Sequence, residues 1–173
     1  MKSLTRTAEG KPRRNAWRTP PWFFAELELR QGYRFELDVF ASASNALCPY
    51  YIDRRLDALR TPWDAETVFA NPPDALHLEA VRRAISEGWS GSYWRARLLV
   101  RCGIESQAWQ LASAHALESV IVCPRLNYAD PSGGRSNGAG RHSTLFTFSK
   151  ESARRPVDGH GRQIRFEQFR RPQ

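Results

Sequence analysis

Short apolar runs alternate along the chain with segments of helical spacing, and this alternation restricts the fold more than any other feature. The runs are too short for helices and are typical of strands. Strands that alternate with helices predict an α/β domain of three layers with a mainly parallel sheet. The predicted strands are residues 35–40, 67–70, 97–100, 119–123 and 144–148. The predicted helices are one that Thr19-Pro20-Pro21 opens and Gly32 ends, then residues 76–87 and 106–116, with a short helix near 53–59.

Capping residues set the expected helix ends. Thr19 can cap the first helix, and the prolines after it are tolerated in the first turn. Gly32 can end the same helix. Gly88 is expected to stop the second helix.

The two ends of the chain differ in composition from the middle. Residues 1–14 carry five Lys or Arg and almost nothing to bury, so they are predicted to form a basic N-terminal arm. Residues 15–150 are predicted as the folded domain. Residues 151–173 are predicted as a basic C-terminal tail, in which Ile164, Phe166 and Phe169 can still dock.

The chain has a net charge of +8 and a pI of about 10.0. This balance favours a polyanionic partner, nucleic acid before an anionic membrane surface. No apolar run approaches the length of about 18 residues that a membrane span needs, and the N-terminus lacks the apolar stretch of a secretory signal. Cys48, Cys102 and Cys123 are odd in number and widely spaced, so we expect a cytoplasmic protein without disulfides or a metal.

Two segments that directly follow predicted strands are candidate binding sites. Ligands of open α/β sheets bind outside the carboxyl ends of the strands. The segment after Leu37 and the segment Asn71-Pro72-Pro73 both lie at such ends.

Asn71-Pro72-Pro73 is the sharpest signal for chemistry. Two consecutive prolines fix φ and have no N–H groups, so the backbone is stiff and its acceptors point outward. The side-chain oxygen of Asn71 and the carbonyl of Pro72 can both accept hydrogen bonds from one exocyclic NH2 group. These bonds release the amine lone pair for attack on a sulfonium methyl group, with rigid positioning as the main source of rate. The alternative is that Asn-Pro-Pro only ends a strand and begins a helix.

Several short motifs stand in order around Asn71. They are Trp17-Arg18-Thr19-Pro20, Leu37-Asp38-Val39-Phe40-Ala41-Ser42, Asn45-Ala46-Leu47-Cys48, Asp57-Ala58-Leu59 with Trp63, Phe69-Ala70-Asn71-Pro72-Pro73, and Arg125-Leu126 followed by Ser143-Thr144-Leu145-Phe146-Thr147-Phe148. In this order and spacing the chain resembles the phage-type DNA N6-adenine methyltransferase family. The resemblance implies a reduced, Rossmann-like methyltransferase domain, S-adenosylmethionine as cofactor, double-stranded DNA as partner and methylation of adenine N6. It also implies a phage or prophage origin, and hence the cytoplasm of a bacterial host.

The resemblance assigns cofactor contacts to four residues before Asn71. Thr19 and Pro20 match the segment that contacts the methionine part of the cofactor. Asp38 matches the acidic strand end whose carboxylate can take the ammonium group, and Asp57 resembles the acid that accepts from the cofactor adenine. Without the resemblance, Thr19 is a helix cap, Asp38 a turn residue and Asp57 a solvated helix residue.

The loop after the first predicted strand lacks the glycines that usually allow close approach to a cofactor. Phe40, Ala41 and Asn45 are the cofactor-binding candidates in this loop. Only 26 residues separate Phe40 from the strand that begins at Thr67, so the ribose-binding strand is expected to be shortened, with Asp53 as the ribose acceptor.

Asp74 departs from the family pattern, which has an aromatic residue there to stack on the extruded base. Extrusion costs on the order of a few kcal/mol, which stacking partly offsets. The aromatic residues considered as replacements are Trp63, Trp89, Trp94 and Tyr128. The catalytic candidates are Asn71, Pro72, Pro73 and Asp74.

Residues 130–142 are rich in Gly, Ser, Asn and Arg and are predicted as a loop, either one that follows a DNA backbone or a plain surface loop. The DNA-binding candidates are Arg125, Arg135, Arg141 and Ser143. We expect a monomer or weak dimer that binds no membrane.

Four functions stay open at the level of sequence. The first is an adenine-N6 DNA methyltransferase, and the second is a cytosine-N4 enzyme of the same design. The third is a catalytically weak or inactive DNA-binding relative, which Asp74 favours. The fourth is a basic structural or packaging protein without a cofactor site.

Overall fold

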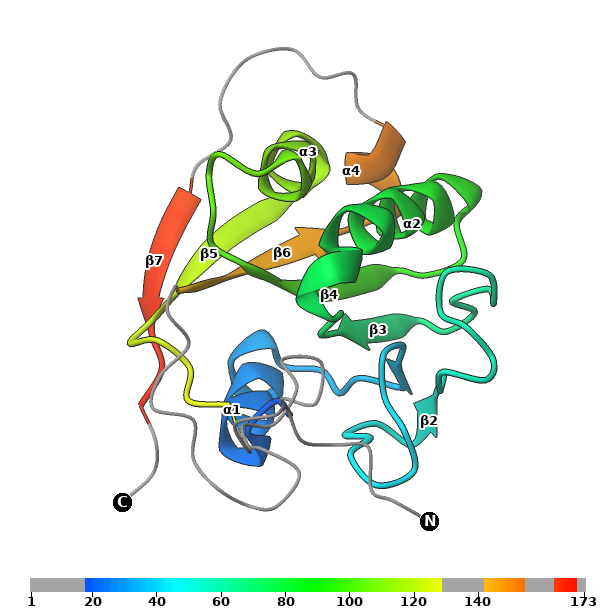
Figure 1. Ribbon diagram of the computed structural model, residues 1–173, viewed down its shortest axis with the longest axis horizontal. Coiled ribbons are helices and arrows are strands. Elements are labelled where there is room, and N and C mark those ends of the chain that lie inside the picture. The colour runs from blue at the N-terminus through cyan, green and yellow to red at the C-terminus, as the bar shows by residue number, and fades with distance from the viewer. Residues whose placement is uncertain (1–17, 129–141, 155–163, 171–173) are drawn as a thin grey trace, which may run out of the picture.

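The computed structural model describes residues 18–128, 142–154 and 164–170 (Figure 1). Its strands are β1 (Leu37–Asp38), β2 (Tyr50–Tyr51), β3 (Thr67–Ala70), β4 (Arg95–Arg101), β5 (Glu118–Cys123), β6 (Ser143–Phe148) and β7 (Ile164–Gln168). Its helices are α1 (Pro21–Gln31), the 3-10 helix η2 (Asp74–Leu76), α2 (His77–Ser90), α3 (Gln107–His115) and α4 (Lys150–Arg154). The strand prediction for residues 67–70 is confirmed at both ends.

The strands form one sheet of seven in the order β2-β1-β3-β4-β6-β5-β7. Among the described strands, only β6 runs antiparallel to its neighbours, and the other pairings are parallel. Helices α2, α3 and α4 cover one face, and α1 covers the other (Figure 1). The predicted Rossmann-like α/β architecture of three layers and a mainly parallel sheet is therefore confirmed.

Alternate residues along the central strands supply the two cores. Val68, Leu98 and Phe146 belong to the core beneath α2 and α3. Phe69 and Leu99 belong to the opposite core, which contains the apolar side of α1. This alternation follows from the pleat of the strands, which turns successive side chains to opposite faces.

The chain changes direction across the sheet at β1. Strand β2 pairs with one side of β1, and β3 pairs with the other side. A ligand of an open α/β sheet binds where such a reversal leaves a crevice at the carboxyl ends of the strands. The two candidate segments, after Leu37 and at Asn71-Pro72-Pro73, lie at the carboxyl ends of β1 and β3 beside this reversal.

Helix α1 ends at the predicted glycine but does not begin with the predicted cap. Gly32 adopts a left-handed φ of 74°, and its N–H donates to the Glu28 carbonyl. Pro20, not Thr19, is the N-cap residue, and no side-chain cap is formed. The cap prediction for Thr19 is wrong because its hydroxyl accepts a hydrogen bond from a distant side chain, described below.

Gly88 does not stop α2, because the helix continues to Ser90 and Gly91 provides the left-handed end with a φ of 85°. Gly88 is a packing position instead. A Cβ atom there would lie 2.7 Å from the Tyr93 hydroxyl and 3.0 Å from the Cβ of Ala153. The close approach of these two side chains explains why glycine occupies this position.

The region between β1 and β3 is more irregular than predicted. The strand expected at residues 35–40 is reduced to Leu37–Asp38, and the helix expected near 53–59 is replaced by turns. Asp53 and Asp57 accept backbone N–H groups through their carboxylates, which offers the backbone an alternative to helix. The shortened strand expected here is confirmed, since β2 is two residues long.

The fold continues past the predicted boundary at residue 150. Helix α4 and strand β7 lie in the region interpreted as a tail, and β7 pairs with β5 along its whole length. The ring of Phe169 is buried, with its centroid 4.9 Å from that of Phe23, which confirms its predicted docking. The predicted arm at residues 1–14 lies outside the described residues. None of the described helices is long and apolar enough to cross a membrane.

Candidate active site

The side chain of Asn71 is held from across the site. Its Nδ2 donates to Oγ1 of Thr19 at 2.9 Å. Thr19 is buried, and Asn71 is half-buried directly after β3. With its amide nitrogen engaged, the oxygen Oδ1 is the Asn71 atom oriented to accept from a ligand.

The segment that carries Thr19 also contacts the loop after β1. Nη1 of Arg18 donates to the Ser44 carbonyl at 3.1 Å, and Nη2 donates to its hydroxyl at 3.3 Å. Residues 18–19 therefore join the loop after β1 to the loop after β3. Two of the predicted sites, Thr19 and Asn71, are brought into direct contact by this arrangement.

Asp38 is a buried carboxylate at the end of β1, 5% exposed. Its partner in the β1–β3 register is Phe69, two residues before Asn71. The backbone N–H of Leu47 donates to its Oδ2 at 3.2 Å, and the N–H of Phe40 also bonds it. Burial raises the pKa of Asp38 to about 6 against these bonds. No described basic residue forms a salt bridge with it, so its charge lacks a counter-ion from the described part of the chain.

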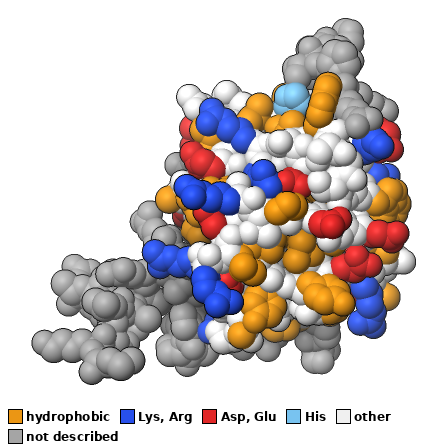
Figure 2. Space-filling view, turned by 90° about the vertical axis from the view of Figure 1, so that its right-hand side faces the viewer, with side chains coloured by type: hydrophobic (Ala, Val, Ile, Leu, Met, Phe, Trp, Pro, Cys, Tyr) orange, Lys and Arg blue, Asp and Glu red, His pale blue; other side chains and the backbone are white. Residues whose placement is uncertain are grey.

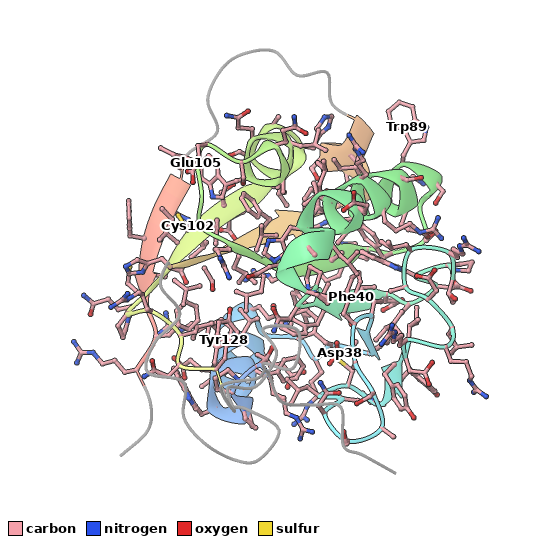
Figure 3. The ribbon with its side chains drawn as sticks, in the orientation of Figure 1. Asp38, Phe40, Trp89, Cys102, Glu105 and Tyr128 are labelled. Atoms are coloured by element: carbon pink, nitrogen blue, oxygen red, sulfur yellow. The ribbon has the colours of Figure 1, made fainter. Side chains whose placement is uncertain are left out.

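The loop after β1 contains no glycine, and hydrogen bonds within the loop fix its shape. Oδ1 of Asn45 accepts from the Ser42 N–H at 2.7 Å and from the Ser42 hydroxyl at 2.6 Å. Ala41 is buried, and Phe40 packs edge-on to Trp63, with ring centroids 6.5 Å apart. Figure 3 shows Asp38 and Phe40 close together at this edge. The candidates Phe40, Ala41 and Asn45 thus lie in one loop beside Asp38.

Asp53 and Asp57 lie beyond β2 and serve turns. Oδ1 of Asp53 accepts the N–H groups of Arg55 and Leu56, both at 3.0 Å. Asp57 has a left-handed φ of 59°, and its Oδ1 accepts the N–H of Leu59 at 3.1 Å. Neither carboxylate forms a hydrogen bond with Asn71 in the described part of the chain, although Asp53 follows the strand next to β1.

The carboxylate of Asp74 is paired on two sides. It forms a salt bridge with Arg101, the last residue of β4. Its Oδ1 also lies 3.7 Å from Nε2 of His77, the first residue of α2. Neither partner was predicted from the sequence. For His77 the available signal was its spacing, three residues after Asp74. For Arg101 it was the position at the end of the strand next to β3.

His77 also contacts the backbone of the Asn-Pro-Pro segment. Burial lowers the pKa of His77, and its hydrogen bond to the Pro72 carbonyl opposes this by raising the pKa. The carbonyl oxygen has two lone pairs, so one remains to accept from a ligand. A lowered pKa keeps the ring neutral near pH 7 and leaves Asp74 and Arg101 as the charged pair beside Pro72.

Of the aromatic residues considered as replacements at position 74, three are not placed to stack on a base beside Asn71. Trp63 is fully buried in the core. Trp94 precedes β4 and so lies at the amino ends of the parallel strands, whereas Asn71 lies at their carboxyl ends. Figure 3 shows Trp89, near the end of α2, pointing outward. Tyr128 lies at the same edge as Asn71, with its hydroxyl 2.7 Å from that of Ser143. Burial raises the pKa of Tyr128 to about 12, so it stays protonated.

The predicted DNA contacts fall partly within the described chain. Arg125 is exposed just beyond the carboxyl end of β5. Ser143 begins β6 and is buried, with its hydroxyl bonded to Tyr128. Arg135 and Arg141 lie outside the described residues. Figure 2 shows acidic and basic side chains interspersed on the face that it presents, so the positive charge is not gathered there.

The described residues contain no group of three metal-binding side chains, and the three cysteines are free.

The chain is similar in sequence to a known protein family and to a phage protein. Residues 6–158 match the sequence model of the family described as DNA N-6-adenine-methyltransferase (Dam). A DNA N-6-adenine-methyltransferase of Haemophilus phage HP1 (strain HP1c1) is 30% identical over 84 residues, which are 49% of this chain and 49% of the phage protein. The similarity thus spans about half the length of that relative. The family match covers most of the chain, including Thr19, Asp38 and Asn71, and the chain therefore belongs to the DNA N-6-adenine-methyltransferase (Dam) family.

Proposed function

We propose that this protein transfers a methyl group from S-adenosylmethionine to N6 of adenine in DNA. The observation that carries the proposal is the hydrogen bond from Asn71 to Thr19, which orients Oδ1 of Asn71 as an acceptor at the strand reversal. Family membership and the name of the phage relative support adenine and DNA as the target.

Asn71 and Pro72 form the amine-binding part of the site. Oδ1 of Asn71 accepts from one N–H of the target amine, and the Pro72 carbonyl accepts from the other. Two acceptors favour tetrahedral geometry at the nitrogen, so its lone pair is no longer delocalised into the base. Because Pro72 and Pro73 fix the backbone, these acceptors need little rearrangement when the base arrives. The amine becomes more acidic as it is alkylated, so its proton leaves without a strong base.

The residues after β1 fit the cofactor. S-adenosylmethionine supplies an electrophilic methyl group on a sulfonium sulfur. Its ammonium group suits Asp38, because a buried carboxylate without a basic partner among the described residues is stabilised by a cation. We assign Thr19 and Pro20 to the methionine part, with Phe40, Ala41 and Asn45 lining the same loop. We assign Asp53 to the ribose and Asp57 to the cofactor adenine.

DNA contacts are assigned to Arg125, Arg135, Arg141 and Ser143. Phosphate contacts of this kind predict binding that weakens steeply as the salt concentration rises. We place the reaction in the cytoplasm of a bacterial host, in keeping with the phage relative.

The salt bridge between Asp74 and Arg101 favours a second candidate function, a DNA-binding relative with weak or absent turnover. An ion pair occupies the position at which an aromatic residue would stack on the extruded base. Such a protein would bind DNA in a salt-sensitive manner and transfer no methyl group.

Methyl transfer to unmodified DNA separates these functions. The protein is incubated with S-adenosylmethionine carrying a labelled methyl group, and the DNA is digested and analysed by nucleoside mass spectrometry. We expect labelled N6-methyladenine from the parent chain and none from Asn71→Ala, with thermal unfolding to verify that the variant is folded. Labelled N4-methylcytosine would transfer the activity to cytosine, and DNA binding without any labelled nucleoside would support the inactive relative.

A further inference from the structure

Strand β7 forms one edge of the sheet, since it pairs with β5 on one side only among the described strands. The N–H of Phe169 donates to the Cys123 carbonyl at 2.7 Å, so the backbone at this position faces β5. Backbone groups alternate in direction along a strand, and those of Phe166 and Gln168 therefore point away from β5. The Gln168 carbonyl fits this assignment, because it accepts instead from Nη2 of Arg30 at 2.7 Å.

The side chains of β7 carry a charge pattern centred on Phe166. The phenyl ring is 72% exposed, on the face of the sheet opposite to the buried Phe169. Arg165 and Glu167 flank it and lie on the α1 face, where Arg165 pairs with Glu118 and Glu167 lies 3.7 Å from Nη1 of Arg30.

We propose that β7 pairs antiparallel with β7 of a second copy of this chain, about a two-fold axis at Phe166. In this register the two Phe166 residues exchange both backbone hydrogen bonds. Each Arg165 then lies opposite Glu167 of the second copy, and opposite charges in such cross-strand pairs are stabilising. The same surface serves both partners, which is the requirement for a closed two-fold dimer.

The charge pattern selects this register from its neighbours. An axis at residue 165 would place two arginines opposite each other, and an axis at residue 167 would oppose two glutamates. Parallel pairing in register would place Arg165 opposite Arg165 and Glu167 opposite Glu167 of the second copy. Of these arrangements, only the axis at Phe166 makes the charges alternate in sign across the interface. Glu118 and Arg165 of one copy are then followed by Glu167 and Arg30 of the second copy.

Cross-linking tests the register directly. Cα atoms of a hydrogen-bonded antiparallel pair lie about 5.5 Å apart, within the range that a disulfide spans. We expect Phe166→Cys to give a covalent dimer under mild oxidation. Gln168→Cys is the matched control, because it lies on the same face of the same strand but opposite Ile164 of the second copy. Both variants are made in a Cys123→Ser background, because the free Cys123 is the register partner of Gln168 on β5. Equal cross-linking of both variants, or none at Phe166→Cys, would overturn the register.

A proline variant tests the dimer without oxidation. The N–H of Phe166 points away from β5, so Phe166→Pro keeps the β5–β7 bonds, and edge strands tolerate proline at such positions. Sedimentation velocity over a concentration series should show a dimer in the parent chain and a dissociation constant raised on the order of tenfold or more in the variant. Phe166→Thr, which keeps the N–H, should stay closer to the parent. A parent chain that remains monomeric at all concentrations would refute the proposal, as would a dimer unaffected by Phe166→Pro.

Discussion

Nδ2 of Asn71 and Oγ1 of Thr19 form a hydrogen bond of 2.9 Å between residues 52 positions apart. The bond fixes which end of the Asn71 amide can accept from a substrate. Removing the hydroxyl in Thr19→Val keeps the shape of the side chain but frees the amide to turn. We expect methyl transfer to fall between about tenfold and 100-fold, as misplacement of a positioning contact does. Single-turnover kinetics measure this loss, and Thr19→Ser should retain most of the rate because it keeps the hydroxyl.

Asp38 predicts a pH dependence of stability. Burial raises the pKa of Asp38 from its ordinary value of 3.8 to about 6, so the folded state holds a proton that the unfolded state loses between these values. The resulting stabilisation, on the order of 3 kcal/mol, is present below about pH 4 and is lost as the pH rises through about 6. Asp38→Asn should flatten the free energy of unfolding over this range in urea titrations. Asp64→Asn, at an exposed aspartate, should not, and an equal effect of both would contradict the assignment.

Cofactor binding should have the opposite slope. An ionised Asp38 attracts the ammonium group of S-adenosylmethionine, whereas a protonated one does not. Below about pH 6 we expect the affinity for S-adenosylmethionine to fall about tenfold for each further pH unit. Calorimetric titrations across this range measure the slope, and Asp38→Asn should bind weakly at every pH. A parent affinity that is flat from pH 5 to pH 8 would remove Asp38 from the cofactor site.

The Asp74–Arg101 pair is expected to contribute little to stability, because both side chains are partly exposed, at 38% and 40%. Asp74→Asn should therefore change the unfolding free energy by less than about 1 kcal/mol. Asp74→Tyr should raise methyl transfer between about fivefold and 150-fold if stacking on the extruded base is what this position lacks, since a stacked base is worth about 1–3 kcal/mol. Asp74→Leu removes the same charge without adding a flat ring, so equal rates in Asp74→Leu and Asp74→Tyr would exclude stacking as the cause.

Gly88 should tolerate no side chain while Tyr93 keeps its hydroxyl. A Cβ at Gly88 would meet that hydroxyl at 2.7 Å, and the hydroxyl donates to the Ala84 carbonyl at 2.5 Å, so it has no room to move. We expect Gly88→Ala to destabilise the fold by about 1–3 kcal/mol, as overpacking does. Tyr93→Phe removes the nearest obstacle, so Gly88→Ala should cost less in that background. Additive losses of stability in the double variant would show that the two sites do not clash.

The sequence predicted features that depend on local patterns. Residues 67–70 form a strand followed by Asn-Pro-Pro, and Gly32 ends α1, because a short apolar run and a left-handed glycine are properties of a few neighbouring residues. The position of the segments after Leu37 and Ala70 at the carboxyl ends of strands was also expected from the order of strands and helices in an α/β domain.

Features that depend on distant partners were not predictable in this way. Thr19 has the chemistry of a helix cap, and only the folded chain shows that its hydroxyl meets Asn71. Gly88 was interpreted as a helix end, because no pattern in the neighbouring sequence indicates that it packs against Tyr93. Strand β7 lies in a basic segment, and its place in the sheet depends on β5, which lies more than forty residues earlier in the chain.

The contact between Thr19 and Asn71 makes the proposed activity of this protein depend on complete folding. The segment before α1 and the segment after β3 must both be docked before the acceptor is oriented, so a partly folded chain with an intact sheet would still lack a competent site. During refolding, methyl transfer should reappear only with burial of the aromatic residues beneath α1. Under the proposed function, incompletely folded molecules therefore transfer no methyl group.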